Sequence, residues 1–577
     1  MLPTGLRVVL VFLSVIGGNA NADIAMEVAQ AWEVAEQRSE ATVAWMESEY
    51  GNPAMFARYP TVENLTTGRW FTASHTRDWR AGFWPGTLWF LAQRTGNAVW
   101  RQRATDWSDA LAQSGNTDHD IGFILLGSMG KARAFHDDFN DPGGAYRAFA
   151  AAAITTAAAK LDSRFNMPNT GGIPVPAGFT RSWNSPFQDP YPVCVDNLMN
   201  LELMFLAYEL NGGLPQQRVW FDHALTHART SIARHMRPDG GTYHVVKHFE
   251  SGTRIGQIER KSTLQGYGDE TTWSRGQAWA IYGFSAAYRH ARRDPGTDAS
   301  DVLAAARSAA DYFIDRLPHH HSADPYNHRP DDFVPPSDFD ASLGEPIGPW
   351  NDADNNYNSA TGSGLGDRKP ATNAFTLRDS SAAAIAASGL IELSGHVPNP
   401  GDRARYLGAA EDILHCLITY DGPDPGTDPD YLCQPGETAH PGILKAGSVK
   451  WGDPNQAVIY GDYYFLEALA RYEALQARRV LAETQRMAGS EGERHVEFET
   501  RSPAPALTFR VQSSPDLSPG SWETVAAKTG GGPWAGSATI SEAALPDGRV
   551  RINISNPSPA ASGFFRILTR SVGGGGP

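Results

Sequence analysis

Asp196 is the residue of this sequence whose position most directly calls for a chemical role. It opens the apolar helical segment "VDNLMNLELMF", in which Glu202 and Glu209 share the side expected to face water. Asp196 falls opposite them, and a carboxylate on an inward face is unfavourable unless it is paired, neutralised or used. The competing interpretation is an acidic residue that answers the positive end of the helix dipole.

A second carboxylate, Asp120 in "TDHDIGF", has a simple structural explanation. Thr117 is a good N-cap, which puts Asp120 at the third helical position, where it completes a capping box. If both carboxylates reach one pocket instead, different surroundings can separate their pKa values into an acid and a base. From the pattern alone these alternatives stay open, and Asp196 and Asp120 become the predicted catalytic residues through the family resemblance described below.

An arginine between tryptophans suits an acidic sugar. In "TTWSRGQAWAIYGF", Arg275 and Trp279 share a helix face at i, i+4. A guanidinium can hold a carboxylate through two hydrogen bonds while an indole stacks on a sugar ring. The alternative is that Arg275 pairs with Asp269 or Glu270 across a packed helix end.

Aromatic residues are concentrated in "DWRAGFWPGTLWF". Most of the four large rings, Trp79, Phe83, Trp84 and Trp89, should belong to the core. Trp79 precedes the helix expected here, so it is the ring best placed to line a cleft.

The elements that must position these residues are helical. A periodicity of 3.6 residues marks about twelve segments. They lie near 26–49, 83–94, 97–113, 119–135, 143–161, 194–211, 217–235, 272–291, 299–317, 379–394, 402–418 and 459–477. Long loops at 163–193, 237–270 and 318–378 alternate with short ones. Six helical hairpins with functional loops at one end predict an all-α (α/α)6 barrel. A helical solenoid is the alternative, although no fixed sequence period is present.

The pattern changes after the last helical segment. "LTFRVQ" and "RVRINIS" alternate apolar and polar residues, and "GFFRILTR" supplies a further strand, which predicts a small all-β module. We expect a signal peptide at 1–22, the barrel catalytic domain at 23–485, a linker at 486–500 and a β-sandwich-like accessory module at 501–570.

Charge and the N-terminus limit the partners and the location. The formal net charge of -15 argues against nucleic acid and against anionic membrane surfaces. Arg7, the apolar run "VVLVFLSVIGG" and the A-x-A site at 20–22 predict an export signal. The run is too short to span a bilayer. We expect a secreted or periplasmic protein without membrane insertion, as a monomer or dimer.

Cysteines and motifs give no sign of a cofactor. Cys194, Cys416 and Cys433 are an odd number of cysteines, so disulfides are not the framework, and we expect no bridge. No HExxH, paired CxxC, Walker or Rossmann pattern occurs, so we expect neither a metal nor a nucleotide cofactor.

Six segments occur in the order seen in glycoside hydrolase family 88, the unsaturated glucuronyl hydrolases, which this chain resembles over about residues 30–477. They are "DWRAGFWPGTLWF", "DHDIGF", "VDNLMNLELMF", "LQGYGDETTWSRGQAWAIYGF", "RDSSAAAIAASGLIELS" and "VIYGDYYFLEALARY". The resemblance implies an (α/α)6 barrel and a metal-free reaction on oligosaccharides with a 4,5-unsaturated uronic acid at the non-reducing end.

The resemblance also implies how Asp196 is used. The matching aspartate in the family protonates C4 of the ring double bond and takes a proton from the water that adds at C5. The resulting hemiketal collapses, so the sugar opens and releases its partner. We expect burial to raise the pKa of Asp196 for this purpose, while Asp120 stays ionised.

The family match extends to substrate-binding positions. His244 in "GGTYHVVKHFE" matches the pocket histidine, although a lone histidine would otherwise be a surface or loop residue. With it we place the substrate-binding residues Trp79, Phe83, Trp183, Gln265, Arg275 and Trp279. Lys445, Ser448 and Lys450 stand where some members contact sulfate on the adjoining sugar, and a solvated loop is the alternative.

Departures from the family affect the substrate more than the reaction. Leu264 replaces a frequent histidine, Ser337 a frequent tryptophan, and 341–377 resembles an insertion. We therefore predict hydrolysis of unsaturated glycosaminoglycan or ulvan oligosaccharides, with or without sulfate. The alternatives are an unsaturated rhamnogalacturonyl hydrolase on pectin fragments and a non-catalytic glycan-binding barrel.

Overall fold

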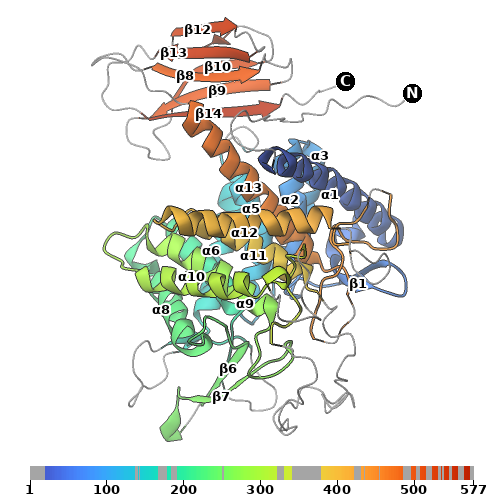
Figure 1. Ribbon diagram of the computed structural model, residues 1–577, viewed down its shortest axis with the longest axis vertical. Helices are drawn as coiled ribbons and strands as arrows, with labels where there is room; N and C mark the ends of the chain where they lie inside the picture. The colour runs from blue at the N-terminus through green and yellow to red at the C-terminus, as the bar shows by residue number, and fades with distance from the viewer. Residues whose placement is uncertain are drawn as a thin grey trace. The chain divides into compact units, whose positions relative to one another are not determined.

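The structure is a computed structural model, and what it describes is mostly helical (Figure 1). The described residues are 20–136, 141, 143–166, 178–183, 191–249, 252–320, 331–340, 378–420, 430–434, 436–451, 453, 455–484 and seven strands between 495 and 571. The proposed insertion 341–377 and most of the expected signal peptide lie outside them.

Helices alternate along the chain between an outer and an inner layer. The outer helices are α1 (Ala20–Tyr50), α3 (Ala98–Asp109), α6 (Ala145–Asp162), α8 (Arg218–His235), α10 (Ser300–Asp315) and α12 (Pro400–Thr419). The inner helices are α2 (Phe83–Thr95), α4 (Ile121–Leu125) with the π-helical turn η3 (Leu126–Gly130) and α5 (Lys131–Phe135), α7 (Asn197–Leu210), α9 (Ser274–Ala291), α11 (Ser380–Ser394) and α13 (Ile459–Thr484).

The packing of these helices forms a closed helical barrel. Inner helices contact one another in the order α4, α7, α9 and α11, and α7, α9 and α11 each pack against flanking outer helices. The outer layer closes where α1 packs on α12, with His415 Nδ1 2.8 Å from Glu27 Oε2. The helical barrel predicted from the sequence is thus confirmed. The ends of the twelve predicted segments match these helices to within four residues, except that α1 begins six residues earlier and α13 ends seven residues later than predicted.

Inner and outer helices differ in sequence because they differ in surroundings. In α11, "SSAAAIAASGLIELS", all but one of the side chains are buried, since the helix is enclosed on every side. Outer α10 instead has one buried stripe and an exposed opposite face. Among the described residues, none of the helices combines the length and apolar character that a bilayer crossing requires.

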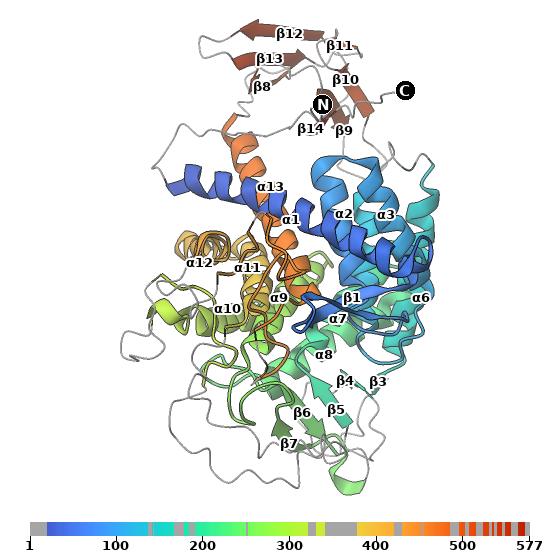
Figure 2. The same cartoon turned by 90° about the vertical axis from the view of Figure 1, so that its right-hand side faces the viewer.

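Short strands and turns occupy the connections. The strand pairs are β1 (Tyr59–Asn64) with β2 (Arg69–Ala73), and β3 (Phe165–Asn166) with β4 (Phe179–Thr180). A three-stranded antiparallel sheet joins β5 (Tyr191–Cys194), β6 (Val245–His248) and β7 (Ile258–Ser262). Single 3-10 turns are η1 (Ala54–Ala57), η2 (Ala110–Gln113), η4 (Pro215–Gln217), η5 (Gly252–Arg254) and η6 (Pro318–His320). Strands β6 and β7 project from the same end of the helical unit in both views (Figures 1 and 2).

The C-terminal strands form two antiparallel sheets of a separate unit. One has the order β11 (Trp534–Ala535), β10 (Glu523–Thr529), β9 (Leu507–Ser514) and β14 (Phe564–Ser571), and the other β12 (Thr539–Ala544), β13 (Arg549–Ser555) and β8 (His495–Arg501). The three strands expected here are β9, β13 and β14. Strand β8 occupies part of the segment expected to be a linker.

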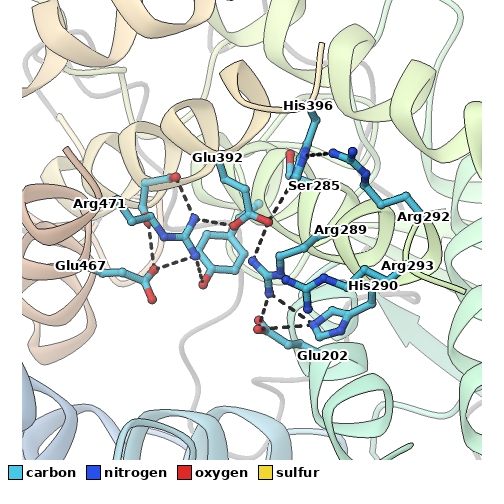
Figure 3. Close-up of polar contacts among 12 residues, drawn as sticks. Glu202, Ser285, Arg289, His290, Arg292, Arg293, Glu392, His396, Glu467 and Arg471 are labelled. Atoms are coloured by element: carbon cyan, nitrogen blue, oxygen red, sulfur yellow. Dashed lines mark hydrogen bonds and ion pairs between the residues drawn. The ribbon is translucent and has the colours of Figure 1, made fainter. Parts of the chain in front are cut away.

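Charged side chains tie the inner helices together beyond their N-terminal turns (Figure 3). Glu392 of α11 accepts from Arg289 of α9 at 2.5 Å and from Arg471 of α13 at 2.7 Å. Arg289 also pairs with Glu202 of α7. Glu202 was expected to face water, and this expectation is wrong because α7 is enclosed on both sides.

Candidate active site

The N-terminal ends of the inner helices meet at one end of the barrel. Trp79, just before α2, stacks on Tyr460 of α13 with ring centroids 5.1 Å apart. Phe83 contacts Phe123 of α4, and Arg275 of α9 pairs with Asp379 at the start of α11. Side chains distant in sequence therefore converge here.

A glycine allows α4 and α7 to approach closely. A Cβ atom at Gly122 would overlap Asn200, so only glycine fits at this crossing. Asn200 Oδ1 in turn accepts a hydrogen bond from the Phe123 amide at 2.7 Å. This contact holds the N-terminus of α4, which Asp120 precedes, beside the N-terminus of α7, which Asp196 precedes.

Asp196 does not cap its helix. Its side chain accepts no hydrogen bond from the first turn of α7. The thiol of Cys194 donates to Asp196 Oδ2, and His244 Nε2 lies 3.4 Å from the same oxygen. The Asp196 carboxylate is thus directed into the site, which favours the functional interpretation over a helix-dipole role.

His244 is buried, and its hydrogen bonds indicate its tautomer. The Leu264 amide donates to His244 Nδ1 at 3.2 Å, so Nδ1 carries no proton. The proton of the neutral ring therefore lies on Nε2, facing Asp196. His244 also packs on Trp273, with ring centroids 4.3 Å apart. The structure thus brings His244 to Asp196.

Asp120 is not part of a capping box. It lies at the N-cap of α4 without a side-chain cap, and the turn is held instead by Asn116 and Asp118, which accept from the amides two residues on at 3.0 Å each. The capping-box interpretation with Thr117 is therefore wrong. Asp120 Oδ1 lies 3.3 Å from His119 Nε2, and burial lowers the pKa of His119 to about 4.

The two carboxyl groups have opposite pKa shifts. Burial and the neighbouring Asp118 and Asp196 raise the pKa of Asp120 well above its usual range. Burial alone would raise the pKa of Asp196, but hydrogen bonds from His244 and Cys194 outweigh it and hold this pKa at about 2. The pKa values of the two carboxyl groups are separated in the ligand-free protein, as expected. Their order is the reverse of the expected one, because the pKa of Asp120 is raised and that of Asp196 is lowered.

Cys194, Asp196 and His244 have ligand-type atoms within 4.8 Å of one another, close enough to surround a metal ion. The protonation of Cys194 and His244 argues against metal binding. Burial raises the pKa of the Cys194 thiol well above its usual range, and His244 bears its proton on the nitrogen that would bind the ion. The donor set therefore fits a hydrogen-bonded cluster around a carboxylate.

Arg275 is placed differently from the expectation. Its side chain is 1 % exposed and pairs with Asp379 Oδ2 at 2.9 Å rather than with Asp269 or Glu270. It also donates to the carbonyl oxygens of Ser448 and Val449. These acceptors occupy the guanidinium, so the predicted contact with a substrate carboxylate is not supported, and Arg275 instead positions the 448–449 segment.

The predicted aromatic contacts separate into core and site residues. Phe83 and Trp279 are buried and pack against other rings, among them Phe123 and Tyr464. They therefore belong to the core that supports the site. Trp79 is partly exposed, as expected of a ring that lines a cleft. Trp183 is also partly exposed, with its ring 6.1 Å from that of His119.

The segment predicted to contact sulfate is mostly occupied by internal contacts. Lys445 is buried and pairs with Asp430 at 2.7 Å and Glu437 at 3.0 Å, so two carboxylates already occupy the ammonium group that was predicted to contact sulfate. Ser448 is buried, with its hydroxyl 3.1 Å from the Lys450 carbonyl oxygen. Lys450 itself is exposed, and it is the cation of the three that a substrate can reach.

Gln265 joins two loops of the site. Its side-chain amide donates to the Val449 carbonyl at 2.9 Å, and its own carbonyl accepts from the Trp451 amide at 2.7 Å. Gln265 is partly exposed, so it remains available to a ligand.

Sequence reasoning missed several residues that surround the carboxyl groups. Cys194 and His119 each precede a catalytic candidate closely, and Tyr460 supports Trp79. The segments quoted for the family contain His119 and Tyr460, and Cys194 directly precedes another, but their contacts depend on the meeting of separate helices. Asp379 also lies in a quoted segment, but nothing in the sequence indicated that it pairs with Arg275, 104 positions away.

Comparisons with known proteins agree on one family, although no family model matches the chain. The chain is 30% identical to the unsaturated glucuronyl hydrolase of Formosa agariphila over 408 residues, 69% of this chain and 81% of the relative. It is 26% identical to the unsaturated chondroitin disaccharide hydrolase of Streptococcus pneumoniae over 77% of this chain and 92% of the relative. The crystal structure of an unsaturated glucuronyl hydrolase specific for heparin matches 77% of this chain and 98% of its own, with 29% identity and a TM-score of 0.55.

Proposed function

Because the chain belongs to the unsaturated glucuronyl hydrolases of glycoside hydrolase family 88, we propose that it hydrates the C4=C5 double bond of an unsaturated uronic acid at the non-reducing end of lyase-generated oligosaccharides. The observation that carries this proposal is the pair Asp196 and Asp120, on adjacent inner helices, with opposite pKa shifts and His244 beside Asp196.

The proton balance of hydration suits such a pair. The reaction takes one proton at C4 and one water at C5, and this water returns one proton. Two carboxyl groups that share a single proton can supply the first and accept the second, so the pair finishes as it began. In this proposal Asp120 holds the proton in the free enzyme, and Asp196 exchanges it with the substrate and the water.

The hydrated sugar then opens without further catalysis by metal or nucleophile. Addition of water makes C5 a hemiketal, and its collapse breaks the bond from C5 to the ring oxygen. The hemiacetal carbon C1 then loses its partner sugar, and the uronate is released as an open-chain keto product. The bond between the oxygen and the leaving sugar is not broken.

The substrate is a glycosaminoglycan or ulvan type of unsaturated oligosaccharide in this proposal. The names of the relatives support this substrate class, because they include a chondroitin disaccharide hydrolase and an enzyme specific for heparin. Lys450 is the exposed cation that can attract a sulfate group on the adjoining sugar. A pectin-derived substrate is the competing possibility.

A panel of lyase-generated disaccharides tests the proposal. Loss of the ultraviolet absorbance of the unsaturated uronate is expected for glycosaminoglycan or ulvan disaccharides and not for the pectin one. Reaction in heavy-oxygen water should label C5 of the released uronate, and a saturated glucuronide should not react. Label at C1, or brisk cleavage of the saturated compound, would establish direct glycoside hydrolysis instead.

A further inference from the structure

The thiol of Cys194 is built into the site by the β5–β6 pairing. Cys194 ends β5, is 4 % exposed and pairs with Val245, the neighbour of His244. Its amide donates to Ser182 Oγ at 2.8 Å. These backbone contacts fix the direction of the side chain, which donates to Asp196 Oδ2.

This thiol is a permanent donor. Burial and the adjacent Asp196 raise the pKa of Cys194 well above its usual range, so it keeps its proton across the pH range in which enzymes work. The proton of His244 Nε2, whose position follows from the Leu264 amide, faces the same oxygen from 3.4 Å.

The surroundings of the Asp196 carboxylate are asymmetric. The Cys194 thiol donates to Oδ2 and His244 Nε2 lies 3.4 Å from it, whereas none of the described side chains or amides donates to Oδ1. A proton on the carboxyl group is therefore favoured at Oδ1, since a proton on Oδ2 would face the hydrogen of the Cys194 thiol.

We propose that Cys194 is a positioning residue for the reaction, which with His244 holds Asp196 through Oδ2 and leaves Oδ1 to exchange the proton with the substrate. This inference rests on the proposed function, because it takes Asp196 as the group that transfers the proton. Cys194 itself forms no bond to the substrate and keeps its own proton throughout.

Loss of the thiol should change how Asp196 titrates. Without the hydrogen bond from the thiol the Asp196 anion is less stabilised, so its pKa should rise. The ionisable groups that face Asp196 are Cys194, His244, His119, Asp120 and His235. Burial lowers the pKa values of His119 and His235 to about 4, so both are neutral near neutral pH and do not replace the thiol.

The first experiment compares the pH dependence of kcat/KM in Cys194→Ala, Cys194→Ser and the wild type. On the acidic limb of the profile, Asp196 and Asp120 together take up a second proton. This limb should shift to higher pH by about 0.5 to 1 pH unit in Cys194→Ala. It should stay near wild type in Cys194→Ser, whose hydroxyl still donates. The decrease in kcat/KM of Cys194→Ala should come from kcat, with KM changed by less than about twofold.

Cys416→Ala is the matched control. This thiol is also buried and lies 3.8 Å from a carboxylate oxygen, that of Asp332, at a different place in the barrel. Its removal should leave the pH profile unchanged. An active wild type whose profile coincides with that of Cys194→Ala overturns the inference, whereas a wild type inactive on every disaccharide refutes the proposed function.

The second experiment needs no activity. The S–H stretch of Cys194, identified in infrared difference spectra against Cys194→Ser, should lie at lower frequency in the wild type than in Asp196→Asn, because a carboxylate is a stronger acceptor than an amide. An S–H stretch that does not respond to Asp196→Asn overturns the inference even if Cys194→Ala fails to fold.

Discussion

The neighbours of Asp196 and Asp120 give these two carboxyl groups opposite proton affinities. Asp196 Oδ2 accepts from the Cys194 thiol and lies 3.4 Å from His244 Nε2, whereas Asp120 faces the negative charges of Asp118 and Asp196. A single proton on the pair therefore resides on Asp120 until a substrate changes the surroundings. This arrangement keeps Asp196 ionised and oriented in the ligand-free enzyme.

Replacement of Asp196 by asparagine should abolish most of the activity while it preserves the fold. Asp196→Asn can neither donate nor accept the proton, so kcat should fall by about a thousandfold or more. Turnover of an unsaturated disaccharide measures this loss, and circular dichroism with the melting temperature checks the fold.

Glu209→Gln is a control on the same helix, because Glu209 is exposed and pairs with His290 and Arg293 away from Asp196. It should retain near wild-type turnover. A folded Asp196→Asn with normal turnover would remove Asp196 from the mechanism.

The catalytic candidates could be identified from the sequence, but their protonation could not. Asp196 stood out because it lies opposite Glu202 and Glu209, and His244 because of a family motif. The pKa of Asp196 depends on donors that the chain brings together only when β5 meets the segment before β6. The sequence pattern indicated only that Asp196 is buried, and burial alone predicts a raised pKa instead of the lowered one.

At the level of elements, Arg275 joins two helices and a loop through its hydrogen bonds. It joins the N-terminus of α9 to Asp379 of α11 and to the carbonyl oxygens of Ser448 and Val449. Its guanidinium lies 4.4 Å from the ring centre of Trp273. A planar fork is suited to several acceptors at once, which an ammonium group is not.

Arg275→Lys should therefore destabilise the protein. A lysine can satisfy one of these acceptors but leaves the buried Asp379 or the loop carbonyls partly unpaired, so the melting temperature should drop by several degrees. Arg229→Lys, at an exposed pair with Asp301, should change it little. If Arg275→Lys instead raised KM with an unchanged melting temperature, Arg275 would contact the substrate directly.

The carboxylates of the inner helices should make stability depend on pH. Burial alone would raise the pKa of Glu392, but Arg289 and Arg471 lower it, and Arg289 and His290 likewise hold the pKa of Glu202 at about 2. Because these values lie below those of the unfolded chain, the stabilisation is present above about pH 5 and lost as the pH falls toward 2.

Glu392→Gln tests this dependence. The substitution leaves two partly buried arginines, Arg289 and Arg471, short of an acceptor and should cost on the order of 2 kcal/mol at neutral pH. The difference in melting temperature should shrink as the pH falls from about 4 toward 2, because the unfolded wild-type chain takes up a proton at Glu392 there while the folded chain does not. A constant difference from pH 7 to pH 3 would show that Glu392 contributes by packing rather than by charge.

The helices could be predicted more completely than their environments. Each inner helix and each outer helix produced a periodic segment, so the positions of the elements agree with the expectation. The same periodicity placed Glu202 in water, because an inner helix is covered on all sides and its polar side chains pair with other inner helices. The π-helical turn η3 within the fourth segment left no signal in the pattern.

At the level of the whole molecule, the chain contains a helical unit and a β-strand unit, with an expected signal peptide before them. The first residue of α1 whose side chain is described as buried is Ile24. Cleavage after Ala22 would leave Ile24 and the buried residues that follow in place. The export that we propose is therefore compatible with the packing of α1.

Expression of the full sequence in a Gram-negative bacterium should yield a mature protein that begins at Asp23 in the periplasm or medium. N-terminal sequencing of the purified protein measures this directly. A chain that retains Met1 and stays in the cytoplasmic fraction would contradict the export proposal, without bearing on the catalytic assignment.

The ionic cluster around Glu392 divides the barrel into two regions with different freedom to change. The helix starts and the loops before them form the candidate active site, whereas the charged pairs further along the same helices join α7, α9, α11 and α13. Loops at the site can therefore be lengthened, shortened or exchanged while the helices stay fastened to one another. Substitutions in loops that carry neither Cys194 nor His244 can therefore change the sugar that is bound while these contacts to Asp196 stay in place.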